Sequence, residues 1–500
     1  MKITFAYSGF ENLGIEYISS VLKGAGHSTE LVLDPKLFDD ITISNRALRS
    51  IFNDSKRSID EIIDSKPDIV AFSVLSDEYR WACDTAAEVK KRMNVPIVFG
   101  GIHPTAVPEE VIERDFVDFV VVGEGEYAML ELVEALENGE PVHNIKNVWS
   151  KKNGTIIKND VRPPVQDLDS LPLPDKDLFF RKYPYCNTFY RIMGSRGCVL
   201  SCSFCGNSYL SKLYKDKGQL YRKRSPHNII EELSLAKQKF PLTSVEFWDG
   251  VFTFDKEWLR ELLSLYKQRI NLPFCCCIHP AMVDEETVQL LSESGCREVE
   301  IGVETIDPRA RKDILHRYET NEQILNALNI INKHNILCPV DMIVGLPGHG
   351  IDDHVEILRF FNEHRVDFIY FCWLRYHPKT EINRYKYLHK KEDINEEEQK
   401  AFFLGGINRN KELFKIQNFA VLMFFLPKRI TSFLIKIKFY KILPSKISPF
   451  FSVYLSICRV QLENRKKKSL HFGEEFKNRY KYFMKRKCKE RLIEIFKGGK

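Results

Sequence analysis

The sequence predicts an α/β protein with two parallel-sheet parts and a basic, mainly helical C-terminal region. Short β-rich runs alternate with helical stretches from residue 2 to about residue 140, and the alternation resumes with longer helices from Tyr190. The third observation is the charge. The last hundred residues hold 24 Lys and Arg against six Glu and no Asp, although the net charge of the whole chain is only +6.

Length and composition agree with a multidomain intracellular protein. With 500 residues, 44% of them hydrophobic, the chain is long enough for about three domains of ~150 residues each. The N-terminus passes directly into a strand-like run without the features of a signal peptide, and the 13 Cys are expected to be reduced thiols. We therefore expect a cytoplasmic protein.

Residues 1–140 are predicted to form a doubly wound parallel sheet, because five strand-like runs alternate with helical segments. One of these helices spans Gly14 to Ala25, with Gly26 as its C-cap, and another spans Asp77 to Met93. The five predicted strands are Ile3–Tyr7, Thr29–Leu33, Ile69–Val74, Pro96–Gly100 and Phe119–Val122.

Glycine-rich turns mark the ends of two of these strands. One is Gly100-Gly-Ile-His-Pro-Thr105 and the other is Gly123-Glu-Gly-Glu126. Ligands of doubly wound sheets bind beyond the carboxyl ends of the strands, where glycine permits positive φ and close approach of the backbone. An ordinary turn between strand and helix would need the same residues, so the turns alone do not establish a ligand site.

A connector is predicted over 141–185, with a hairpin around Lys152-Asn-Gly154 and a proline-rich extended stretch from Arg162 to Pro174. Residues 186–385 are then predicted to form a partial (β/α)6 barrel, whose first long helix opens at Ser225-Pro226. Its predicted strands are Arg191–Ser195, Ser244–Trp248, Phe274–Ile278, Glu298–Gly302, Pro339–Val344 and Phe368–Trp373.

The most informative motif follows the first barrel strand. Cys198, Cys202 and Cys205 form Cys-x3-Cys-x2-Cys, with Phe204 before the last Cys. Three thiolates within eight residues can hold three irons of a 4Fe-4S cluster and leave the fourth iron open for a ligand. Chance proximity and zinc binding are the alternatives, although zinc normally takes four ligands in paired motifs that this segment does not offer.

The cysteine spacing resembles that of radical S-adenosylmethionine enzymes. The glycine turns of the N-terminal part, with the Gly14-to-Leu22 helix, look like the cobalamin-binding domain found ahead of many such enzymes. The resemblance covers some 380 residues. It implies a 4Fe-4S cluster held by the three cysteines, S-adenosylmethionine chelated by the open iron, and cobalamin.

The resemblance also assigns residues to cobalamin. They are Gly100, Gly101, His103, Thr105, Gly123, Glu124 and Gly125. The chain departs from the family after the first strand, where many cobalamin domains carry Asp-x-His-x-x-Gly and this chain has Ser8-Gly-Phe-Glu-Asn-Leu-Gly14. We therefore expect bound cobalamin to lack a histidine ligand from this loop. A domain that has lost the cofactor stays open as the alternative.

In the barrel the resemblance assigns five residues to S-adenosylmethionine. Two departures are Gly250, where the family often has a second acid, and His279, where an Arg is frequent. Each assigned residue also has a structural explanation, since the acids can cap or pair and the glycines can shape a turn. The five residues are Asp249, Gly302, Glu304, Gly345 and Gly348.

The function implied by the resemblance is methylation of an unactivated centre of a small-molecule or lipid-linked substrate, with electrons from an external donor such as flavodoxin or ferredoxin. A radical cyclase, rearrangement or oxidoreductase reaction without methyl transfer is the alternative among enzymes. A non-catalytic cobalamin or cluster sensor is the alternative of another class. Catalytic residues and the substrate are not identified by the sequence.

The C-terminal region, 386–500, combines basic and apolar residues, notably from Lys428 to Leu443 and from Ile447 to Cys458. Neither stretch has an uncharged run near the ~18 residues that cross a bilayer. Basic amphipathic segments suit anionic membrane surfaces, so peripheral membrane contact is one expectation. A helical cover of the barrel with an exposed basic face is the other, and nucleic acid is disfavoured because no RNA-binding signature accompanies the charge.

Overall fold

The computed structural model describes residues 1–37, 52, 54–364, 366–385, 411–444 and 478–486. The chain divides into two compact units. Met1–Tyr190, Lys239–Thr243 and His471–Lys500 form what we call the N-terminal unit, and Arg191–Gln238 with Ser244–Leu470 form the barrel unit.

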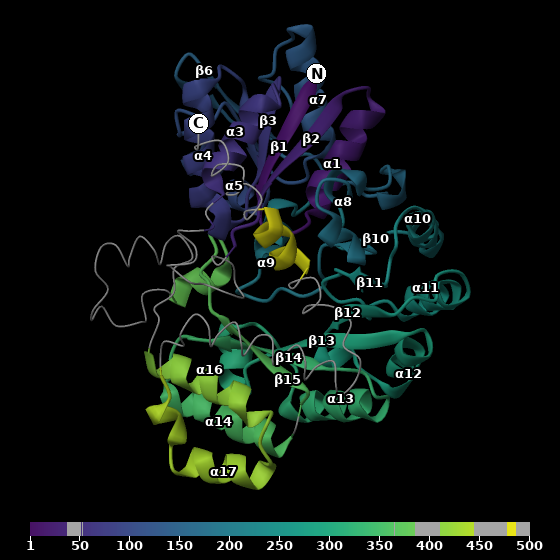
Figure 1. The fold of residues 1–500 in the computed structure, drawn as a ribbon, viewed down its shortest axis with the longest axis vertical. Coiled ribbons are helices and arrows are strands. Elements are labelled where there is room, and N and C mark those ends of the chain that lie inside the picture. Colours follow the sequence, from purple (N-terminus) through teal and green to yellow (C-terminus); the bar gives the residue numbers. More distant parts are fainter. Residues whose placement is uncertain (38–51, 53, 365, 386–410, 445–477, 487–500) are drawn as a thin grey trace, which may run out of the picture. The chain divides into compact units, whose positions relative to one another are not determined.

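A seven-stranded sheet with the order β2-β1-β3-β4-β5-β6-β7 forms the centre of the N-terminal unit (Figure 1). Strands β1 to β5 pair in parallel, which confirms the predicted doubly wound sheet. The order β2-β1-β3-β4-β5 places the switch point at β1 and β3. The strands are β1 Lys2–Ser8, β2 Ser28–Asp34, β3 Ile69–Ser73, β4 Ile97–Gly100, β5 Phe119–Val121, β6 Val148–Lys152 and β7 Thr155–Ile157.

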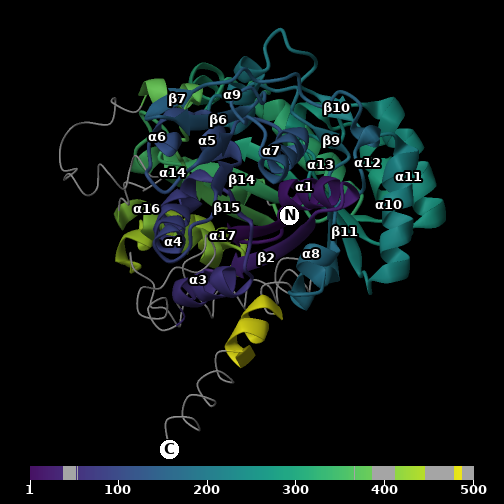
Figure 2. The same ribbon diagram turned by 90° about the horizontal axis from the view of Figure 1, so that it is seen from above.

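Helices cover both faces of this sheet. Helices α1 and α7 pack together on one face (Figure 2), and α3 packs with α4 on the other. The predicted first helix is confirmed, with Asn12 accepting a hydrogen bond from Ile15 N at its start and Gly26 at φ 90° after its end. The helical elements are α1 Leu13–Gly24, α3 Ser55–Asp64, η1 Ser76–Glu78, α4 Tyr79–Arg92, α5 Ile102–Ala106, α6 Pro108–Ile112, α7 Glu126–Asn138, η2 Leu168–Ser170, α8 Asp177–Phe180 and η3 Pro184–Thr188.

The predicted hairpin is present and extends the sheet. Strand β6 pairs antiparallel with both β5 and β7. Its turn residues Asn153 and Gly154 both have positive φ, at 51° and 78°, as a two-residue turn between twisted strands requires. Part of the proposed connector therefore belongs to the sheet of the N-terminal unit.

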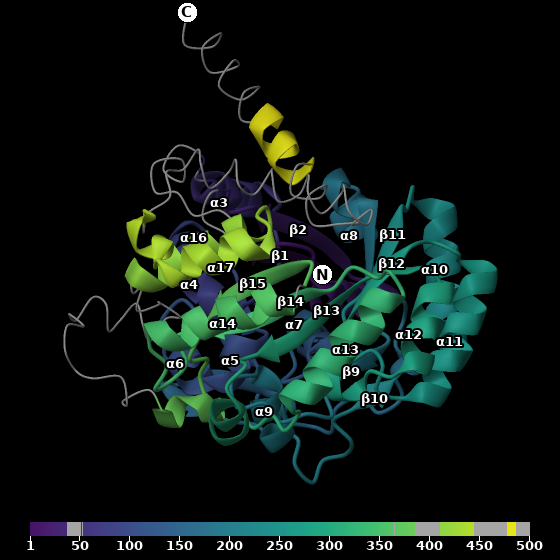
Figure 3. The same cartoon turned by 90° about the horizontal axis from the view of Figure 1, so that it is seen from below.

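The barrel unit contains a six-stranded sheet with the order β15-β14-β13-β12-β11-β8. Strands β11 to β15 pair in parallel, and the helices between them lie on one side of the sheet (Figure 3). This confirms the predicted partial barrel. Its elements are β8 Phe189–Ile192, β9 Ser195–Arg196, α9 Gly206–Leu213, β10 Arg222–Lys223, α10 Pro226–Lys239, β11 Ser244–Phe247, α11 Lys256–Arg269, β12 Phe274–Ile278, η4 Pro280–Met282, α12 Glu285–Glu293, β13 Cys296–Glu304, the π-helical turn η5 Ala310–Ile314, α13 Asn321–Lys333, β14 Pro339–Val344, α14 Ile351–Glu363, β15 Phe368–Trp373 and η6 Glu381–Tyr385.

One strand prediction was wrong. The continuous strand expected over Arg191–Ser195 is two short strands, β8 and β9, and β9 pairs antiparallel with β10. The chain leaves the sheet at Gly194, whose N–H donates to Asp249 and whose carbonyl accepts from Arg224 N. A Cβ at position 194 would lie 2.9 Å from the Trp258 ring, so the bend is closely packed.

The described part of the C-terminal region is helical. Helices α16 (Lys411–Met423) and α17 (Lys428–Lys436) pack with α14 in the barrel unit, and the turn η7 (Phe439–Ile442) packs with α16 and α17. The helix over 478–486 belongs to the N-terminal unit. The charged stretch Lys390–Lys400 and the apolar stretch Ile447–Cys458 lie outside the described residues. None of the described helices is both long enough and apolar enough to cross a membrane.

Candidate cofactor-binding sites

The three cysteines lie in the loop between β9 and α9, which we call the cysteine loop (196–205). Gly197 opens the loop with φ 79°, and a Cβ there would lie 2.2 Å from the Leu220 carbonyl oxygen. Only glycine fits this turn. Cys205 is the N-cap of α9, so the partial positive charge at the start of this helix faces its thiol.

Ser203 and Phe204 fasten the middle of the cysteine loop. Ser203 donates its N–H to the Leu315 carbonyl at 3.0 Å and its hydroxyl to the Ile314 carbonyl at 2.5 Å, and its own carbonyl accepts from Ile382 N. Phe204 packs against a buried apolar cluster that gathers residues from the ends of β14 and β15. This cluster consists of Leu315, Ile343, Leu346, Leu374, Tyr376 and Ile382. The loop is therefore held in place by elements distant in the sequence.

The thiols occupy a low-dielectric environment. Burial raises the pKa of Cys202 to about 11 and also raises the pKa of Cys205, and the three cysteines influence one another electrostatically. Among the described residues no three His, Cys, Asp or Glu side chains are gathered closely enough to hold one metal ion. A 4Fe-4S cluster places its cysteines on different irons, so its ligands need not converge on a point. The donor set and its clustering therefore fit such a cluster.

Arg317 places a positive charge beside this loop. Its Nη1 lies 4.0 Å from Cys202 Sγ and 3.9 Å from Glu304 Oε1, and its Nη2 donates to the Gly302 carbonyl at 2.5 Å. The guanidinium is buried and stays charged. A cation at this position favours thiolate at Cys202 and a negatively charged cluster bound there.

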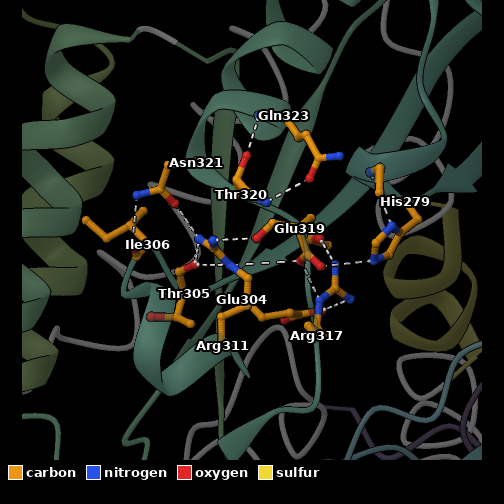
Figure 4. A network of polar contacts seen from close by, with 12 residues as sticks. His279, Glu304, Thr305, Ile306, Arg311, Arg317, Glu319, Thr320, Asn321 and Gln323 are labelled. Atoms are coloured by element: carbon orange, nitrogen blue, oxygen red, sulfur yellow. Dashed lines mark hydrogen bonds and ion pairs between the residues drawn. The ribbon is translucent and has the colours of Figure 1, made fainter. Parts of the chain in front are cut away.

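Glu319 holds Arg317 in this orientation (Figure 4). Arg317 Nε donates to Glu319 Oε1 at 2.7 Å, and the buried Arg311 lies 3.9 Å from the same oxygen. His279 Nδ1 accepts from Ala281 N, so its Nε2 carries the proton that faces Glu319 Oε2 at 3.4 Å. Although burial opposes ionisation, the hydrogen bond from His279 and the charge of Arg317 lower the pKa of Glu319 to about 2.

Glu304 and Gly302 meet at the carboxyl end of β13. The pairing of β13 with β14 shifts between these two residues, and Glu304 has φ 67°, an uncommon conformation for a non-glycine residue. A Cβ at position 302 would lie 2.7 Å from Glu304 Oε1, so the glycine leaves room for this carboxylate. Burial raises the pKa of Glu304 to about 7, against the opposing effect of Arg317.

Asp249 lies at the end of β11 and is buried. Its carboxylate accepts from Gly194 N at 3.1 Å and from the Ser195 hydroxyl at 2.5 Å, and burial raises its pKa to about 6. Asp249 therefore orders the chain that leads into the cysteine loop. At the neighbouring Gly250, a Cβ would lie 3.5 Å from Cys198 Sγ, so a side chain at this position would contact the cysteine.

Gly345 and Gly348 follow β14 with φ 80° and 81°. A Cβ at Gly348 would meet no atom within 4 Å, whereas Leu346 between them belongs to the cluster that holds Phe204. The structure thus brings Glu304, Gly302 and Cys202 together around Arg317, and it connects the Gly345 turn and Asp249 to the cysteine loop through packing and hydrogen bonds.

The proposed cobalamin residues lie at the carboxyl ends of β4 and β5. Gly101 has φ 98°, and a Cβ there would lie 2.8 Å from Val74 N, so the backbones after β3 and β4 are in close contact. Thr105 Oγ1 accepts from Gly123 N at 2.9 Å, which joins the turns after β4 and β5. Gly100 ends β4, and a Cβ there would lie 3.7 Å from Val121 Cβ.

Some of these side chains already have protein partners. Glu124 accepts a hydrogen bond from Val165 N at 2.7 Å, and Gly125 is the N-cap of α7. The His103 ring is buried, with Nδ1 3.1 Å from Ser76 Oγ and its centroid 4.2 Å from that of Tyr79. The structure therefore gives the His103 ring a packing role in the turn after β4.

A buried ion-pair triad joins the loop after β1, through Glu11, to Glu16 of α1 and to Lys176. Lys176 Nζ lies 2.7 Å from Glu11 Oε1 and 2.9 Å from Glu16 Oε2, with all three side chains buried. Burial, with a contribution from Glu11, raises the pKa of Glu16 well above its usual range, against the opposing effect of Lys176. The loop itself holds no histidine.

Sequence patterns did not predict the residues that hold these loops. They are Arg317 and Glu319, and the triad of Glu11, Glu16 and Lys176. Charged residues next to apolar positions give a weak signal, because most charged side chains lie on the surface. Only the three-dimensional arrangement shows that these are buried.

Comparison with known proteins agrees with this arrangement. Residues 4–133 match the B12 binding domain family and residues 192–361 match the radical SAM superfamily. The chain therefore belongs to the radical S-adenosylmethionine enzymes that carry a B12-binding domain, and its cofactors are a 4Fe-4S cluster, S-adenosylmethionine and cobalamin.

Two curated relatives illustrate the range of the family. An uncharacterized methyltransferase of Pyrococcus horikoshii is 27% identical over 383 residues, covering 75% of this chain and 78% of that protein. The anaerobic magnesium-protoporphyrin IX monomethyl ester cyclase of Rubrivivax gelatinosus is 24% identical over 402 residues, covering 76% and 68%.

Solved structures show the same fold. The radical S-adenosylmethionine methyltransferase TsrM from Kitasatospora setae has a TM-score of 0.60 at 19% identity, covering 76% of this chain and 74% of that one. The cobalamin-dependent S-adenosylmethionine radical enzyme OxsB has a TM-score of 0.62 at 15% identity, covering 99% and 81%.

Proposed function

We propose that this enzyme methylates an unactivated carbon or phosphorus centre of a small-molecule substrate, using cobalamin as the methyl carrier. The observation that carries the proposal is that one chain joins the cysteine loop to a B12-binding domain. When bound, the cluster supplies an electron to S-adenosylmethionine and the cobalamin supplies the methyl group. The similarity to a methyltransferase over 75% of the chain supports the same reaction.

In this proposal Cys198, Cys202 and Cys205 hold the cluster, and the ends of β11, β13 and β14 bind S-adenosylmethionine. Glu304 is suited to the methionine amine, because its carboxylate lies beside Arg317 on the cysteine-loop side of β13. Gly302 leaves room for Glu304, and the turn of Gly345 and Gly348 allows close approach of a ligand. Asp249 acts indirectly, by accepting hydrogen bonds from the Gly194 N–H and the Ser195 hydroxyl, which fixes the chain before the cysteine loop.

Cobalamin would be held by the carboxyl ends of β4 and β5. The backbone of Gly100, Gly101, Gly123 and Gly125 forms the contact surface, and the Thr105 hydroxyl fixes the position of Gly123. Glu124 anchors the same turn to Val165, and His103 packs beneath it. These residues would bind cobalamin mainly through the shape of the backbone surface. Such a surface suits a large, rigid ligand better than a few polar contacts would.

Partners follow from the chemistry. Reductive cleavage requires one electron per turnover, so we propose an external donor of the flavodoxin or ferredoxin kind. We also propose peripheral membrane contact of the C-terminal region, for which a lipid-linked substrate is the natural counterpart. The barrel unit supports this with an exposed basic and apolar surface on α17, described below.

The test is to incubate the anaerobically reconstituted holoenzyme with a reductant and S-adenosylmethionine that carries a deuterated methyl group. The proposal expects 5'-deoxyadenosine, S-adenosylhomocysteine and deuterated methylcobalamin. Transfer of label to cobalamin requires no knowledge of the substrate, because remethylation precedes the substrate step. Absence of both S-adenosylhomocysteine and label on the corrinoid would refute methyl transfer.

The second candidate is a radical reaction without methyl transfer, which the similarity to the Rubrivivax cyclase favours. It predicts 5'-deoxyadenosine without S-adenosylhomocysteine. A sensor without turnover predicts neither product, so a single chromatogram separates the three functions.

A further inference from the structure

An exposed apolar surface lies on α17 and the residues beside it in the barrel unit. We call it the α17 patch. Its central side chains are Phe433 and Ile437, which are 59% and 52% exposed. The remaining members are Phe425, Ile430 and Ile442, at 44%, 47% and 74% exposed. Large apolar side chains gathered in this way on one short segment mark an interaction surface.

The patch is directed away from the body of the unit. Thr431 and Ile435 of α17 are buried, and the Asn362 side chain of α14 donates to the Lys428 carbonyl and to the Ser432 hydroxyl, so the inner face of α17 is fixed. At 3.6 residues per turn, Phe433 lies on the opposite side of the helix from the buried pair. Helices α16 and α17 lie with α14 in Figure 3.

Positive charge surrounds the patch. Lys428, Arg429, Lys436, Lys438 and Lys441 are all exposed within the same segment. No Asp or Glu occurs in the sequence between Glu412 and Glu463. Lys428 also donates to the carbonyl of Glu363 at the end of α14, which ties the start of α17 to the body of the unit.

We propose that the α17 patch docks the enzyme on an anionic lipid surface, with Phe433 and Ile437 inserted among the acyl chains and the surrounding Lys and Arg on the headgroups. A short helix with exposed apolar side chains surrounded by Lys and Arg has the chemistry of an interfacial anchor. A protein partner would need an acidic, concave surface of matching shape. A membrane needs only the positive charge and the exposed apolar side chains that the structure shows.

The α17 patch rests on the proposed membrane contact of the C-terminal region and assigns that contact to one segment. The helix over 478–486 does not belong to the patch, because it packs into the N-terminal unit. There Arg479 is buried against the Phe10 ring at 4.3 Å and contacts the Pro35 carbonyl, and Phe483 packs against Tyr183 and Tyr185. Arg479 therefore has a different role from the basic residues of the α17 patch, and deletion of the whole tail would not test the patch.

The experiment is cosedimentation of the full-length holoenzyme with vesicles of phosphatidylcholine alone or mixed with phosphatidylglycerol. We expect binding to the anionic vesicles only, weakened by salt. The variant Phe433→Ser/Ile437→Ser should bind at least about tenfold less, because two apolar side chains no longer leave water. Arg429→Gln/Lys436→Gln should lose about fivefold for each charge removed. Leu235→Ser on α10 and Lys267→Gln on α11, both exposed, are the matched controls and should bind like the parent protein.

A second readout does not depend on the loss of binding. In Phe433→Trp the new indole should shift its emission to the blue on addition of anionic vesicles and not of neutral ones. Absence of binding at low salt, binding unchanged by Phe433→Ser/Ile437→Ser, or the lack of this shift would overturn the proposal. A dimer that dissociates to monomers in Phe433→Ser would also overturn it, because a second copy of the chain would then cover the patch.

Discussion

At the scale of single residues, the structure shows buried charged groups arranged around the cysteine loop. Arg317 contacts Cys202, Glu304 and the Gly302 carbonyl, and Glu319 holds Arg317. A buried ion pair costs desolvation, so a cluster of this kind is retained where it fixes a geometry. Here the geometry is that of the cysteine loop and of the proposed S-adenosylmethionine site.

The cysteines themselves give the first prediction. Cys198→Ala/Cys202→Ala/Cys205→Ala should abolish cluster binding and the formation of 5'-deoxyadenosine, because no other thiol is placed in the loop. Iron and sulfide content and product chromatography measure the effect. Cys83→Ala on α4 is the control and should keep both the cluster and the activity. Cleavage activity that survives in the triple variant would disprove the assignment.

Glu319 gives a prediction about pH. Its pKa is about 2 in the folded protein and higher in the unfolded chain, so its stabilising effect is complete above the unfolded value and is lost as the pH falls toward 2. Glu319→Gln should therefore lower the free energy of unfolding by about 3 kcal/mol at pH 7. The difference from the parent should shrink below about pH 5.

Urea unfolding of the cluster-free protein over a pH series measures this difference. Glu286→Gln is the matched control, since Glu286 pairs with Arg260 on the surface. It should change the free energy of unfolding by less than about 1 kcal/mol. A cost of Glu319→Gln that does not change between pH 7 and low pH would contradict the electrostatic explanation.

The close contact of Gly101 with Val74 gives a third prediction. Gly101→Ala should destabilise the N-terminal unit by at least about 2 kcal/mol and weaken cobalamin binding, because the new Cβ would clash with backbone atoms at a positive φ. Gly139→Ala is the control, since Gly139 has φ 69° and open space around it. That change should cost about 1 kcal/mol and leave cobalamin binding unchanged. Equal effects of the two substitutions on cobalamin affinity would contradict the proposed contact surface.

At the scale of secondary structure elements, loops that face the ligand edge are fixed by residues far away in the sequence. The loop after β1 is tied to Lys176, and the cysteine loop is tied to Leu315 and Ile382. The elements themselves were largely predictable, because hydrophobic periodicity and capping residues identify strands and helices. The long-range contacts were not, since they depend on how the elements pack.

Two particular elements show the limit. The strand expected over Arg191–Ser195 breaks at Gly194, because Asp249, more than fifty residues later, captures its N–H. In contrast, the hairpin around Asn153-Gly154 was correctly predicted. Asn and Gly readily adopt the positive φ angles that a two-residue turn requires, so the residue types alone indicate the turn. A turn set by adjacent residues could therefore be predicted from the sequence. A strand end set by a hydrogen bond to a distant carboxylate could not.

Lys176 gives the prediction that belongs to this scale. Lys176→Met should lower the free energy of unfolding by about 3–5 kcal/mol, because the buried acidic pair Glu11 and Glu16 loses its cation. Lys23→Met is the matched control, since Lys23 pairs with Asp175 at the surface and should contribute at most about 1 kcal/mol. Urea unfolding followed by circular dichroism compares the two variants, and similar losses would show that the triad is no more stabilising than a surface pair.

At the scale of the whole molecule, one chain carries both cofactor domains. The sequence identified the cysteine loop, the glycine turns and the absence of the usual histidine motif. None of the three histidines that the structure describes in the N-terminal unit lies in the loop after β1. His103 is packed against Tyr79, His143 contacts Ser150, and His27 lies at the opposite end of the sheet, before β2.

Bound cobalamin in the Co(II) state should therefore show no imidazole nitrogen coupling from the protein in its EPR spectrum. The loop after β1 holds no histidine, and its Glu11 is paired with the buried Lys176. Nitrogen hyperfine structure that disappears in His103→Asn would contradict this prediction, because it would identify His103 as the cobalt ligand.

The anaerobic absorbance spectrum of the protein, reconstituted with iron, sulfide and hydroxocobalamin, tests whether one chain binds both cofactors. We predict iron-sulfur and corrinoid bands together in the full chain. We also predict that Cys198→Ala/Cys202→Ala/Cys205→Ala loses the iron-sulfur bands and keeps the corrinoid bands. A full chain that retains no corrinoid, or a triple variant that retains the cluster, would contradict these predictions.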